Sequence, residues 1–508
     1  MKTKSIMIQG TGSYVGKSAI ASALCRIFRQ DGHRVAPFKP QNISLNSYIT
    51  GEGGEIGRSQ AVQAEAAGVE PSVNMNPILI KPTSDKTAQV IVRGNVYGNL
   101  PAYQDREFKK IALKAITESY QRLTEQYDVI IIEGAGSPAE INLPDDIANM
   151  GSAELIGSPV LLVGDIDKGG VFASLVGTME LLQEQKRKLI RGFIINKFRG
   201  DKSLLGPGLK FLEDKYGYPV LGVIPYFKDI YLPEEDSLSL ERLESSRDRE
   251  GLRLGVIHLP HISNFTDFDA LEREEGVRVE YLSNGLDLKA MDLIIIPGSK
   301  NTIEDLLYLK ETGIKEKIME HYHRGGRVVG ICGGYQMLGN IISDPYEVEG
   351  KIESAEGLGL LDVDSTLEKE KATTLVEALP TEAKEWAGDN GTLKGYEIHM
   401  GRTTLNKGIR SMFHICKRQS QEVALQDGAV SSDGRVWGTY VHGIFDNDDF
   451  RRSFLNLLRR EKGLPSREAT RFSYNEEKER SFNLLASLVR ENLDVDKVNK
   501  IIFNYLKE

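Results

Sequence analysis

Gly10-Thr-Gly-Ser-Tyr-Val-Gly-Lys-Ser18 lies between a short apolar stretch, residues 4–9, and an apolar-periodic stretch, residues 19–28. The first stretch predicts a β-strand and the second predicts an α-helix. A glycine-rich turn between a strand and a helix aims backbone N–H groups at a phosphate, and the helix N-terminus adds a partial positive charge. The segment therefore predicts a phosphate-binding loop in an α/β domain.

Four residues of this loop are predicted to hold a nucleotide, ATP, and its metal ion. Lys17 would reach the terminal phosphates, and the Ser18 hydroxyl suits Mg²⁺. Gly12 and Gly16 would let the backbone approach the phosphates closely. Thr11 stands where the usual G-x-x-x-x-G-K-[ST] spacing has its first glycine. The loop resembles that of the dethiobiotin synthetase group of ligases, and it lacks the additional Lys of partition-type ATPases.

Further apolar runs alternate with helical patterns along the first half of the chain. These runs are residues 35–38, 127–132, 160–163 and 192–195. Continuous Val, Ile and Leu runs predict strands that are buried on both faces, and their alternation with helices predicts a parallel, doubly wound sheet. Asn196 and Lys197, which follow the last run, are predicted to read the adenine edge of the nucleotide.

Charged residues follow three of these strands. Glu133 is predicted to hold Mg²⁺ or its water shell, and Lys39 to contact the reacting phosphate or carboxylate. Asp165 and Asp167 are predicted to bind metal or to position a substrate. Ligands lie at the carboxyl ends of the strands in open parallel sheets, which favours these functions. The alternative for each residue is a loop-end charge that caps a helix.

Composition limits the class of protein. The chain has 508 residues, 40% of them apolar, and a formal net charge of −9, which argues against a nucleic-acid partner. No apolar run is long enough to cross a bilayer, and the N-terminal segment lacks the features of a signal peptide. The cysteines, Cys25, Cys332 and Cys416, are far apart and show no metal-binding spacing. We therefore expect a protein of the reducing cytoplasm.

A second α/β domain is predicted after a polar, charged linker. Its apolar runs are residues 252–258, 291–297 and 327–332. The predicted boundaries are residues 1–232 for the nucleotide-binding domain, 233–250 for the linker, 251–447 for the second domain and 448–508 for a C-terminal helical segment. We expect the helical segment to pack against the second domain.

Cys332 lies in the sequence Gly330-Ile-Cys-Gly-Gly334, between a predicted strand and a predicted helix. This is the arrangement of a nucleophile elbow, in which a sharp turn exposes the reactive side chain above the sheet. The helix N-terminus favours a negative thiolate, the reactive form of cysteine. The backbone N–H of Gly333, which directly follows the nucleophile, is predicted to donate to an oxyanion.

The thiolate needs a base that also protonates the leaving amine. His442 follows a strand-like run downstream of Cys332, where class I glutamine amidotransferase domains carry their base, and His399 is the alternative. The segment in which Gly298 and Ser299 end another predicted strand is a candidate source of the second oxyanion donor, with Gly298 as the expected residue.

The usual third member of such a site is missing from its expected place. Many relatives have Glu two residues after the histidine, where this chain has Ile444. Either a Cys–His pair suffices, or another acid, Glu397 or Asp446, orients the ring. The sequence leaves these possibilities open.

The chain resembles the cobyric acid synthase family of cobalamin-pathway amidotransferases over residues 9–443. The motifs that carry the resemblance are QGTGSYVGKS, FKPQNISLNS, GGEIGRSQAVQAEAAG, NMNPILIKP, GDIDKGGVFASL, RGFIINKFRGD, PGSKNT, GICGGYQMLG and GYEIHMGR. PQNISLNS, DIDKGGVFA and INKFRGD separate this family from the neighbouring a,c-diamide synthases.

The resemblance implies ATP- and glutamine-dependent amidation of the b, d, e and g carboxylates of adenosylcobyrinic acid a,c-diamide. Cys332 would attack glutamine, His442 would protonate the departing ammonia, and the ammonia would react at the ATP site. A homo-oligomer is possible. Four basic residues in or near these motifs are candidates for contact with the corrinoid polycarboxylate: Arg58, Lys81, Arg93 and Arg199.

Two alternatives remain. A ligase for another polycarboxylate, such as an a,c-diamide synthase, would share both sites. An ATP-dependent switch would hydrolyse ATP without glutamine and would give Cys332 no role, which the intact elbow disfavours.

Overall fold

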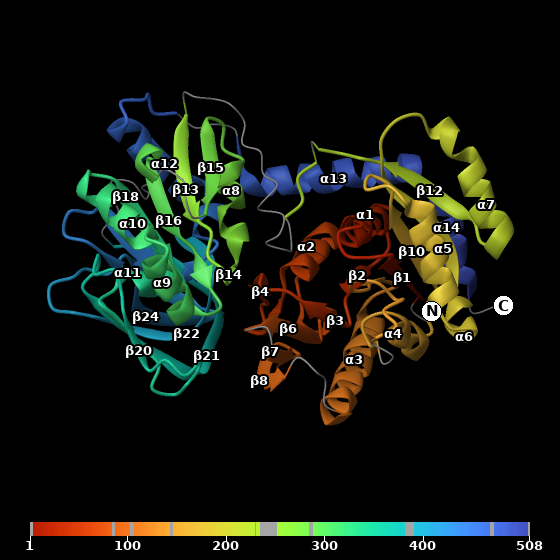
Figure 1. Cartoon of the computed structure of the whole chain (residues 1–508), viewed down its shortest axis with the longest axis horizontal. Helices are drawn as coiled ribbons and strands as arrows, with labels where there is room; N and C mark the ends of the chain where they lie inside the picture. Colours follow the sequence, from red (N-terminus) through yellow and green to blue (C-terminus); the bar gives the residue numbers. More distant parts are fainter. Residues whose placement is uncertain are drawn as a thin grey trace.

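The computed structural model has two lobes, each built around its own β-sheet (Figure 1). It describes residues 4–83, 87–101, 106–142, 146–228, 230–233, 251–283, 288–381, 391–467 and 472–505. Most of the predicted linker lies outside these described residues. Within them, no helix is long and apolar enough to span a membrane.

The first lobe contains a six-stranded parallel sheet in the order β12-β11-β10-β1-β9-β2. Its strands are β1 (Lys4–Gly10), β2 (Val35–Phe38), β9 (Val129–Glu133), β10 (Val160–Asp165), β11 (Ile190–Phe198) and β12 (Val220–Pro225). Ile6 and Ile8 enter one core cluster, while Met7 between them enters the other. Both faces of the sheet are thus buried, and the predicted doubly wound parallel sheet is confirmed.

Helices cover both faces of this sheet. They include α1 (Lys17–Gln30), α3 (Arg106–Gln126), α4 (Met150–Ile156), α5 (Val171–Leu181), α6 (Glu184–Arg187) and α7 (Gly206–Tyr216). The α1 helix begins at the end of the phosphate-binding loop, directly after Gly16. Its first turn therefore lies at the carboxyl edge of the sheet, where ligands bind in this fold.

Smaller strands of the first lobe lie between its main sheet and the second lobe (Figure 1). β3 (Gln41–Ile43), β6 (Ile78–Pro82), β7 (Thr87–Val92) and β8 (Asn95–Pro101) form one sheet, and β4 (Ser47–Ile49) pairs with β5 (Glu55–Gly57). The α2 helix (Arg58–Ala67) follows β5 directly. These elements come from the long insertion between β2 and α3, and they bring the first lobe into contact with the second.

The second lobe has a sheet in the order β15-β13-β16-β18-β26-β25. The strands are β13 (Leu252–Ile257), β15 (Val277–Leu282), β16 (Leu293–Ile296), β18 (Arg327–Ile331), β25 (Ala429–Val430) and β26 (Val436–Thr439). All pair in parallel except β25, which forms an antiparallel edge. The flanking helices are α8 (Asp269–Glu272), α9 (Thr302–Glu311), α10 (Ile314–His323) and α11 (Gly333–Leu338).

A mixed second sheet completes this lobe. It contains β19 (Ile341–Ser343), β20 (Ser354–Glu356), β21 (Val363–Pro380), β22 (Leu393–Leu405), β23 (Phe413–Arg418), β24 (Gln421–Asp427) and β27 (Val441–His442). A short antiparallel ladder joins β14 (Ile262–Ser263) to β17 (Gly298–Ser299). The long strands β21 and β22 reach toward the first lobe.

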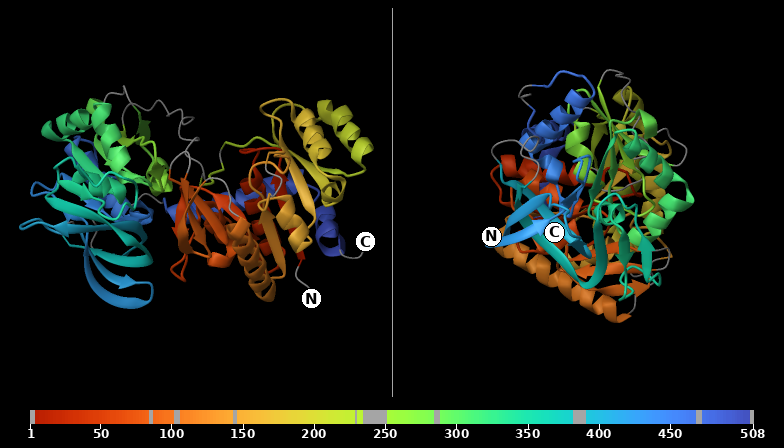
Figure 2. Two further views of the ribbon diagram at one scale, coloured as in Figure 1. Left: turned by 60° about the horizontal axis from the view of Figure 1, so that its bottom comes forward. Right: turned by 90° about the vertical axis from the view of Figure 1, so that its left-hand side faces the viewer.

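The C-terminal helices divide between the two lobes. α12 (Asp448–Glu461) places Phe450 and Phe454 against Trp437 of the second lobe. α13 (Tyr474–Asn492) then runs across to the first lobe (Figures 1 and 2), where it and α14 (Val495–Asn504) join one face of the parallel sheet. The expectation that the whole segment packs against the second domain is therefore wrong for α13 and α14.

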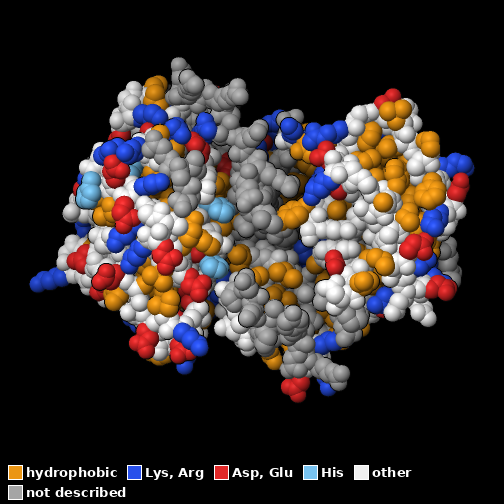
Figure 3. All heavy atoms as spheres, in the orientation of Figure 1, with side chains coloured by type: hydrophobic (Ala, Val, Ile, Leu, Met, Phe, Trp, Pro, Cys, Tyr) orange, Lys and Arg blue, Asp and Glu red, His pale blue; other side chains and the backbone are white. Residues whose placement is uncertain are grey.

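Surface charges of both signs are mixed. On the face in Figure 3, the coloured Lys and Arg side chains alternate with Asp and Glu side chains over both lobes. This distribution matches the moderate net charge of −9.

Candidate active sites

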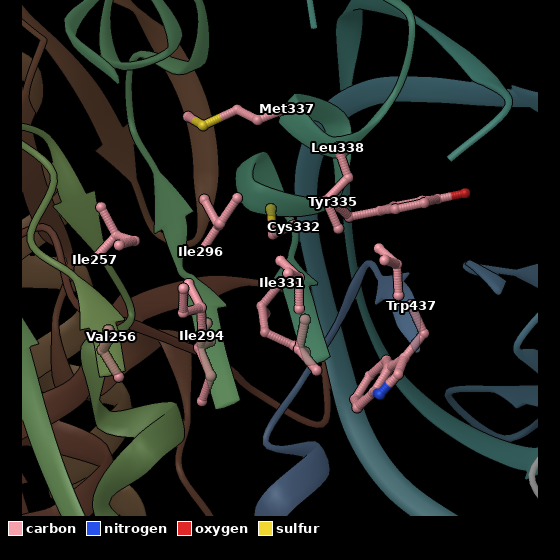
Figure 4. Close-up of a cluster of buried hydrophobic side chains, with 14 of the residues drawn as sticks. Val256, Ile257, Ile294, Ile296, Ile331, Cys332, Tyr335, Met337, Leu338 and Trp437 are labelled. Carbon is pink, nitrogen blue, oxygen red and sulfur yellow. The ribbon is translucent and has the colours of Figure 1, made fainter. Parts of the chain in front are cut away.

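Cys332 lies at a sharp turn between β18 and α11. Its backbone has φ 52° and ψ −108°, a conformation that costs free energy in a residue with a side chain. Gly330 and Gly334 permit the turn, because a Cβ at Gly330 would collide with the Gly334 carbonyl and a Cβ at Gly334 with the Ile296 carbonyl. Figure 4 shows Cys332 where the strand meets the helix, beside Ile296 and Ile331. The turn has the geometry expected of a nucleophile elbow.

His442, in β27, is buried, and Asp267 fixes its ring. Nδ1 lies 2.6 Å from Asp267 Oδ2, while Asp267 Oδ1 accepts the Gly443 N–H at 2.9 Å. Burial disfavours the imidazolium, but the charge and hydrogen bond of Asp267, together with the neighbouring Cys332, outweigh burial and raise the pKa of His442 to about 10. A protonated His442 beside Cys332 is suited to protonate a leaving amine.

The acid on His442 is neither of the two residues considered from the sequence. Glu397 instead pairs with Arg418 at 2.9 Å, and Asp446 Oδ1 has no hydrogen-bond partner among the described residues. Asp267 lies in a polar segment, residues 262–269, that follows the first strand of the second lobe. Polar residues after a parallel strand were the available signal, but nothing in their spacing linked Asp267 to His442.

The alternative base, His399, lines the same cavity but has different partners. Its Nδ1 lies 2.7 Å from the Gly401 carbonyl oxygen, and its ring stacks on Tyr440 with the centroids 3.8 Å apart. Its Nε2 is 3.7 Å from Glu397 Oε1. His442 is the better candidate base, because Asp267 orients its ring at 2.6 Å and the neighbouring Cys332 contributes to its raised pKa.

Backbone donors surround the cysteine. Gly333 begins α11, and a Cβ on it would lie 3.0 Å from the Ser299 backbone nitrogen. Ser299 also lines the cavity beside Cys332. Both Ser299 and Gly298 belong to the β14–β17 ladder, where they pair with Ile262 and Ser263. The Gly333 and Ser299 N–H groups are therefore candidate oxyanion donors, and Gly298, where a Cβ would lie 3.3 Å from His442 Cε1, stays a candidate as well.

A small cavity of about 50 Å³ adjoins Cys332 and His442 and is lined by both lobes. The second lobe contributes Lys300 and Lys371, and the first lobe contributes Lys81. Burial and the charges of the other two lysines lower the pKa of Lys300 to about 7. The cavity next to the cysteine is therefore lined by lysines of both lobes, together with Glu349, and extends to the nucleotide-binding lobe.

The phosphate-binding loop is organised around Lys17 and Glu133. Lys17 Nζ donates to the Gly12 carbonyl at 2.8 Å and to the Gly136 carbonyl at 3.1 Å. Ser18 Oγ donates to Glu133 Oε1 at 2.8 Å. A side chain at Gly12 would meet no neighbouring atom within 4 Å, so the loop backbone is open to a ligand there. These features fit a bound nucleotide phosphate.

Glu133 has the partners expected of a carboxylate that remains ionised. Lys39 Nζ lies 3.1 Å from Oε1, and Gln63 donates to Oε2. Burial opposes ionisation, but the Lys39 charge and the hydrogen bonds from Gln63 and Ser18 outweigh it and hold the pKa of Glu133 below its usual value. One carboxylate and one hydroxyl, with phosphate oxygens, form a common set of Mg²⁺ ligands, so Glu133 and Ser18 fit this ion.

The other predicted nucleotide residues contact the loop itself. Asn196 Nδ2 donates to the Val15 carbonyl at 2.9 Å, while its buried Oδ1 has no hydrogen-bond partner in the described structure. Lys197 Nζ lies 3.0 Å from Asp165 Oδ2 and also contacts the loop backbone. Asp167 pairs with Arg199 at 2.6 Å. The buried acceptor on Asn196 fits an amino group such as that of adenine.

The four basic residues considered for a corrinoid are dispersed. Lys81 and Arg58 are buried between the lobes, where Lys81 pairs with Glu55 at 2.8 Å. Arg93 pairs with Glu118 of α3, and Arg199 stacks over the Tyr226 ring. Their burial leaves Lys81 and Arg58 little surface for a large substrate.

Comparisons with known families match both halves of the chain. A family model described as a CobQ/CobB/MinD/ParA nucleotide binding domain matches residues 6–240, and one for a CobB/CobQ-like glutamine amidotransferase domain matches residues 253–450. Cobyric acid synthase from Caldanaerobacter subterraneus subsp. tengcongensis is 51% identical over 507 residues, covering 98% of this chain and 99% of the relative. The chain belongs to the cobyric acid synthase family.

Other curated cobyric acid synthases agree equally well. The protein from Thermoanaerobacter sp. is 50% identical and that from Clostridium botulinum strain ATCC 19397 is 51% identical, each covering 98% of this chain and 99% of the relative. The predicted family, the two-part fold class and the enzyme class, a glutamine amidotransferase, are therefore confirmed.

Proposed function

We propose that the chain forms adenosylcobyric acid by ATP- and glutamine-dependent amidation of the b, d, e and g carboxylates of adenosylcobyrinic acid a,c-diamide. The observation that carries this proposal is the Cys332–His442–Asp267 arrangement in a cavity that reaches the nucleotide-binding lobe. The near-full-length similarity to cobyric acid synthases supports the substrate.

The second lobe would release ammonia from glutamine. The Cys332 thiolate attacks the side-chain amide carbon, and the Gly333 and Ser299 N–H groups stabilise the resulting oxyanion. As the C–N bond breaks, His442 gives its proton to the leaving nitrogen, and a glutamyl thioester remains. Water then hydrolyses the thioester, and the neutral His442 accepts the water proton.

The first lobe would activate the acceptor carboxylate. Lys17, Gly12, Gly16 and Asn196 would hold ATP, and Ser18 and Glu133 would hold Mg²⁺. Mg-ATP, when bound, would supply the phosphoryl group that activates the corrinoid carboxylate. Ammonia would then displace the phosphate and give the amide.

Lys39 and Asp165 mark where the acceptor would react. Lys39 lies beside Glu133, close to Ser18, so its ammonium group would neutralise the charge that gathers on the reacting phosphate and carboxylate. Asp165 and Asp167 would orient the substrate through their pairs with Lys197 and Arg199.

The site of this reaction would be the cytoplasm. The three cysteines are free, as expected in a reducing compartment.

The test is to incubate purified protein with adenosylcobyrinic acid a,c-diamide, Mg-ATP and either glutamine or an ammonium salt, and to follow the product by mass. We expect wild type to use both nitrogen sources and Cys332→Ala to use only ammonia. ATP hydrolysis without any change in corrinoid mass would overturn the substrate proposal. A parallel reaction with cobyrinic acid tests the neighbouring a,c-diamide synthase activity.

A further inference from the structure

The β4 strand of the nucleotide-binding lobe lies against the glutaminase site of the other lobe. Two hydrogen bonds join Ser47, its first residue, and the preceding Asn46 to the segment that carries Asp267. The Ser47 N–H donates to Asn264 Oδ1 at 3.0 Å, and the Phe265 N–H donates to Asn46 Oδ1 at 3.1 Å. Asn46, Ser47 and Asn264 are all buried. The reciprocal pair therefore fixes the two backbones against each other without competition from bulk water.

Asn264 is directly connected to the catalytic acid. The Asp267 N–H donates to the Asn264 carbonyl at 3.0 Å, which closes a single turn. Asn264 has φ 52°, a left-handed conformation that needs support from its surroundings. The bonds to Asn46 and Ser47 supply this support, so they set the position from which Asp267 reaches His442.

The same strand also contacts the base through Tyr396. The Tyr396 hydroxyl donates to the Ser47 carbonyl at 3.3 Å. The Tyr396 ring stacks on His442, with centroids 5.2 Å apart and planes 16° apart. Ile49 of β4 packs with Tyr396 and Ile398, and the Ile398 carbonyl is the acceptor 3.7 Å from Cys332 Sγ. One short strand thus touches the neighbours of all three catalytic side chains.

We propose that Asn46 and Ser47 are positioning residues of the glutaminase, supplied by the nucleotide-binding lobe. The glutaminase arrangement is then complete only when the two lobes are docked as in this structure. Asn46 and Ser47 belong to the stretch that begins at Lys39, which contacts Glu133 beside the phosphate-binding loop. The inference rests on the glutaminase part of the proposed function and does not depend on the identity of the corrinoid.

The test uses Asn46→Ala in the full chain and measures glutamate released from glutamine. Loss of the acceptor for the Phe265 N–H should lower kcat about tenfold or more with little change in KM, because Asn46 is not among the residues that line the cavity. The alkaline limb of the kcat/KM profile should move to lower pH, since a displaced Asp267 raises the pKa of His442 less. Amidation with ammonium salt should stay near the wild-type rate.

Two further variants separate positioning from general damage. Asn74→Ala removes another buried asparagine of the first lobe, one that bonds to Ser72 within its own lobe, and should leave glutaminase activity unchanged. Asn264→Ala removes the acceptor of the other hydrogen bond. If the two bonds act together, the double variant should lose little more activity than either single variant.

Full glutaminase activity in Asn46→Ala, or effects of the two variants that multiply independently, would overturn the positioning role. Equal loss of glutamine- and ammonia-dependent amidation would also overturn it. A wild-type chain that releases no glutamate, measured against Cys332→Ala, would instead overturn the proposed glutaminase itself.

Discussion

At the scale of single residues, the charge on His442 decides the glutaminase chemistry. Asp267 lies 2.6 Å from Nδ1 and also holds the Gly443 N–H, so the carboxylate fixes both the ring and its backbone. The raised pKa, about 10, keeps the ring protonated through neutral pH. This raised pKa stabilises the folded protein fully below about pH 6.5, the usual value for histidine, and the contribution disappears as pH rises through 10.

Replacing Asp267 by Asn should therefore affect rate and pH profile together. The variant keeps the shape of the side chain but removes the charge, so the pKa of His442 falls. We expect the glutaminase kcat to drop about 10²- to 10⁴-fold and the alkaline limb of the profile to move to lower pH. Both effects are checked by measuring steady-state glutamate release from about pH 6 to about pH 10.5, at intervals of roughly half a pH unit.

Asp446→Asn is the matched control for Asp267→Asn. Asp446 is half-buried near the same site, but the His442 ring is held by Asp267 and not by Asp446. Its variant should keep the wild-type alkaline limb. The same shift in both variants would contradict the assignment of Asp267.

Local spacing decided how many of the site residues could be predicted. Cys332 and the phosphate-binding loop are recognisable because each lies in a short segment between a strand and a helix. Asp267 could not be found in this way, because it lies 175 residues from His442 and only tertiary folding brings them together. The second oxyanion donor could be narrowed only to the strand end at Gly298 and Ser299, because strand pairing and not local spacing places these backbone groups beside the cysteine.

At the scale of elements, α13 is part of the first lobe although it follows the second in sequence. Arg26 of α1 pairs with Glu479 at 3.0 Å and lies over the Phe482 ring. Leu485 and Val489 enter the same core cluster as β1. The sequence predicted a helical segment, but a helical pattern does not identify the partner that covers the apolar face of the helix.

Truncating Leu485 should consequently destabilise the nucleotide-binding lobe. Leu485 is 0% exposed, so Leu485→Ala should cost about 2–5 kcal/mol of unfolding free energy. Hydrogen exchange should accelerate in peptides from α1 and β1 and stay unchanged in peptides from β18 and α11.

Leu484, the preceding residue, provides the control because its side chain is 43% exposed. Leu484→Ala should change stability by about 0.5 kcal/mol or less. Faster exchange in the β18 peptides of Leu485→Ala would show that α13 stabilises the second lobe instead.

At the scale of the whole molecule, a buried ionic network joins the lobes. Glu55 of the first lobe accepts from Lys81 at 2.8 Å and from Lys371 of β21 in the second lobe. Lys371 also donates to Gln89 at 3.2 Å. Burial opposes ionisation of Glu55, but the two lysines outweigh it and hold its pKa far below the usual value. Lys81 and Lys371 also line the glutaminase cavity. The contact between the lobes and the shape of this cavity therefore depend on the same side chains.

Removing the charge of Glu55 should loosen this interface. Glu55→Gln leaves two buried lysines without their carboxylate, and breaking one side of a buried ion pair costs about 3–5 kcal/mol. We expect a lower unfolding midpoint, faster hydrogen exchange in β4 and β21, and a larger radius of gyration by X-ray scattering. Glu118→Gln, which breaks the more exposed pair with Arg93, should cost about 1 kcal/mol or less.

A second change should distinguish uncompensated charge from lost shape at this interface. Adding Lys371→Met to Glu55→Gln removes one of the orphaned cations and replaces it with an apolar side chain. If uncompensated charge is the cause, the double variant should regain part of the lost stability, because apolar groups of similar volume often replace buried ion pairs at little cost. Additive losses of stability in the double variant would show that the lobes depend on the hydrogen-bond geometry of Lys371. An unchanged radius of gyration in Glu55→Gln would show that the remaining contacts hold the lobes together.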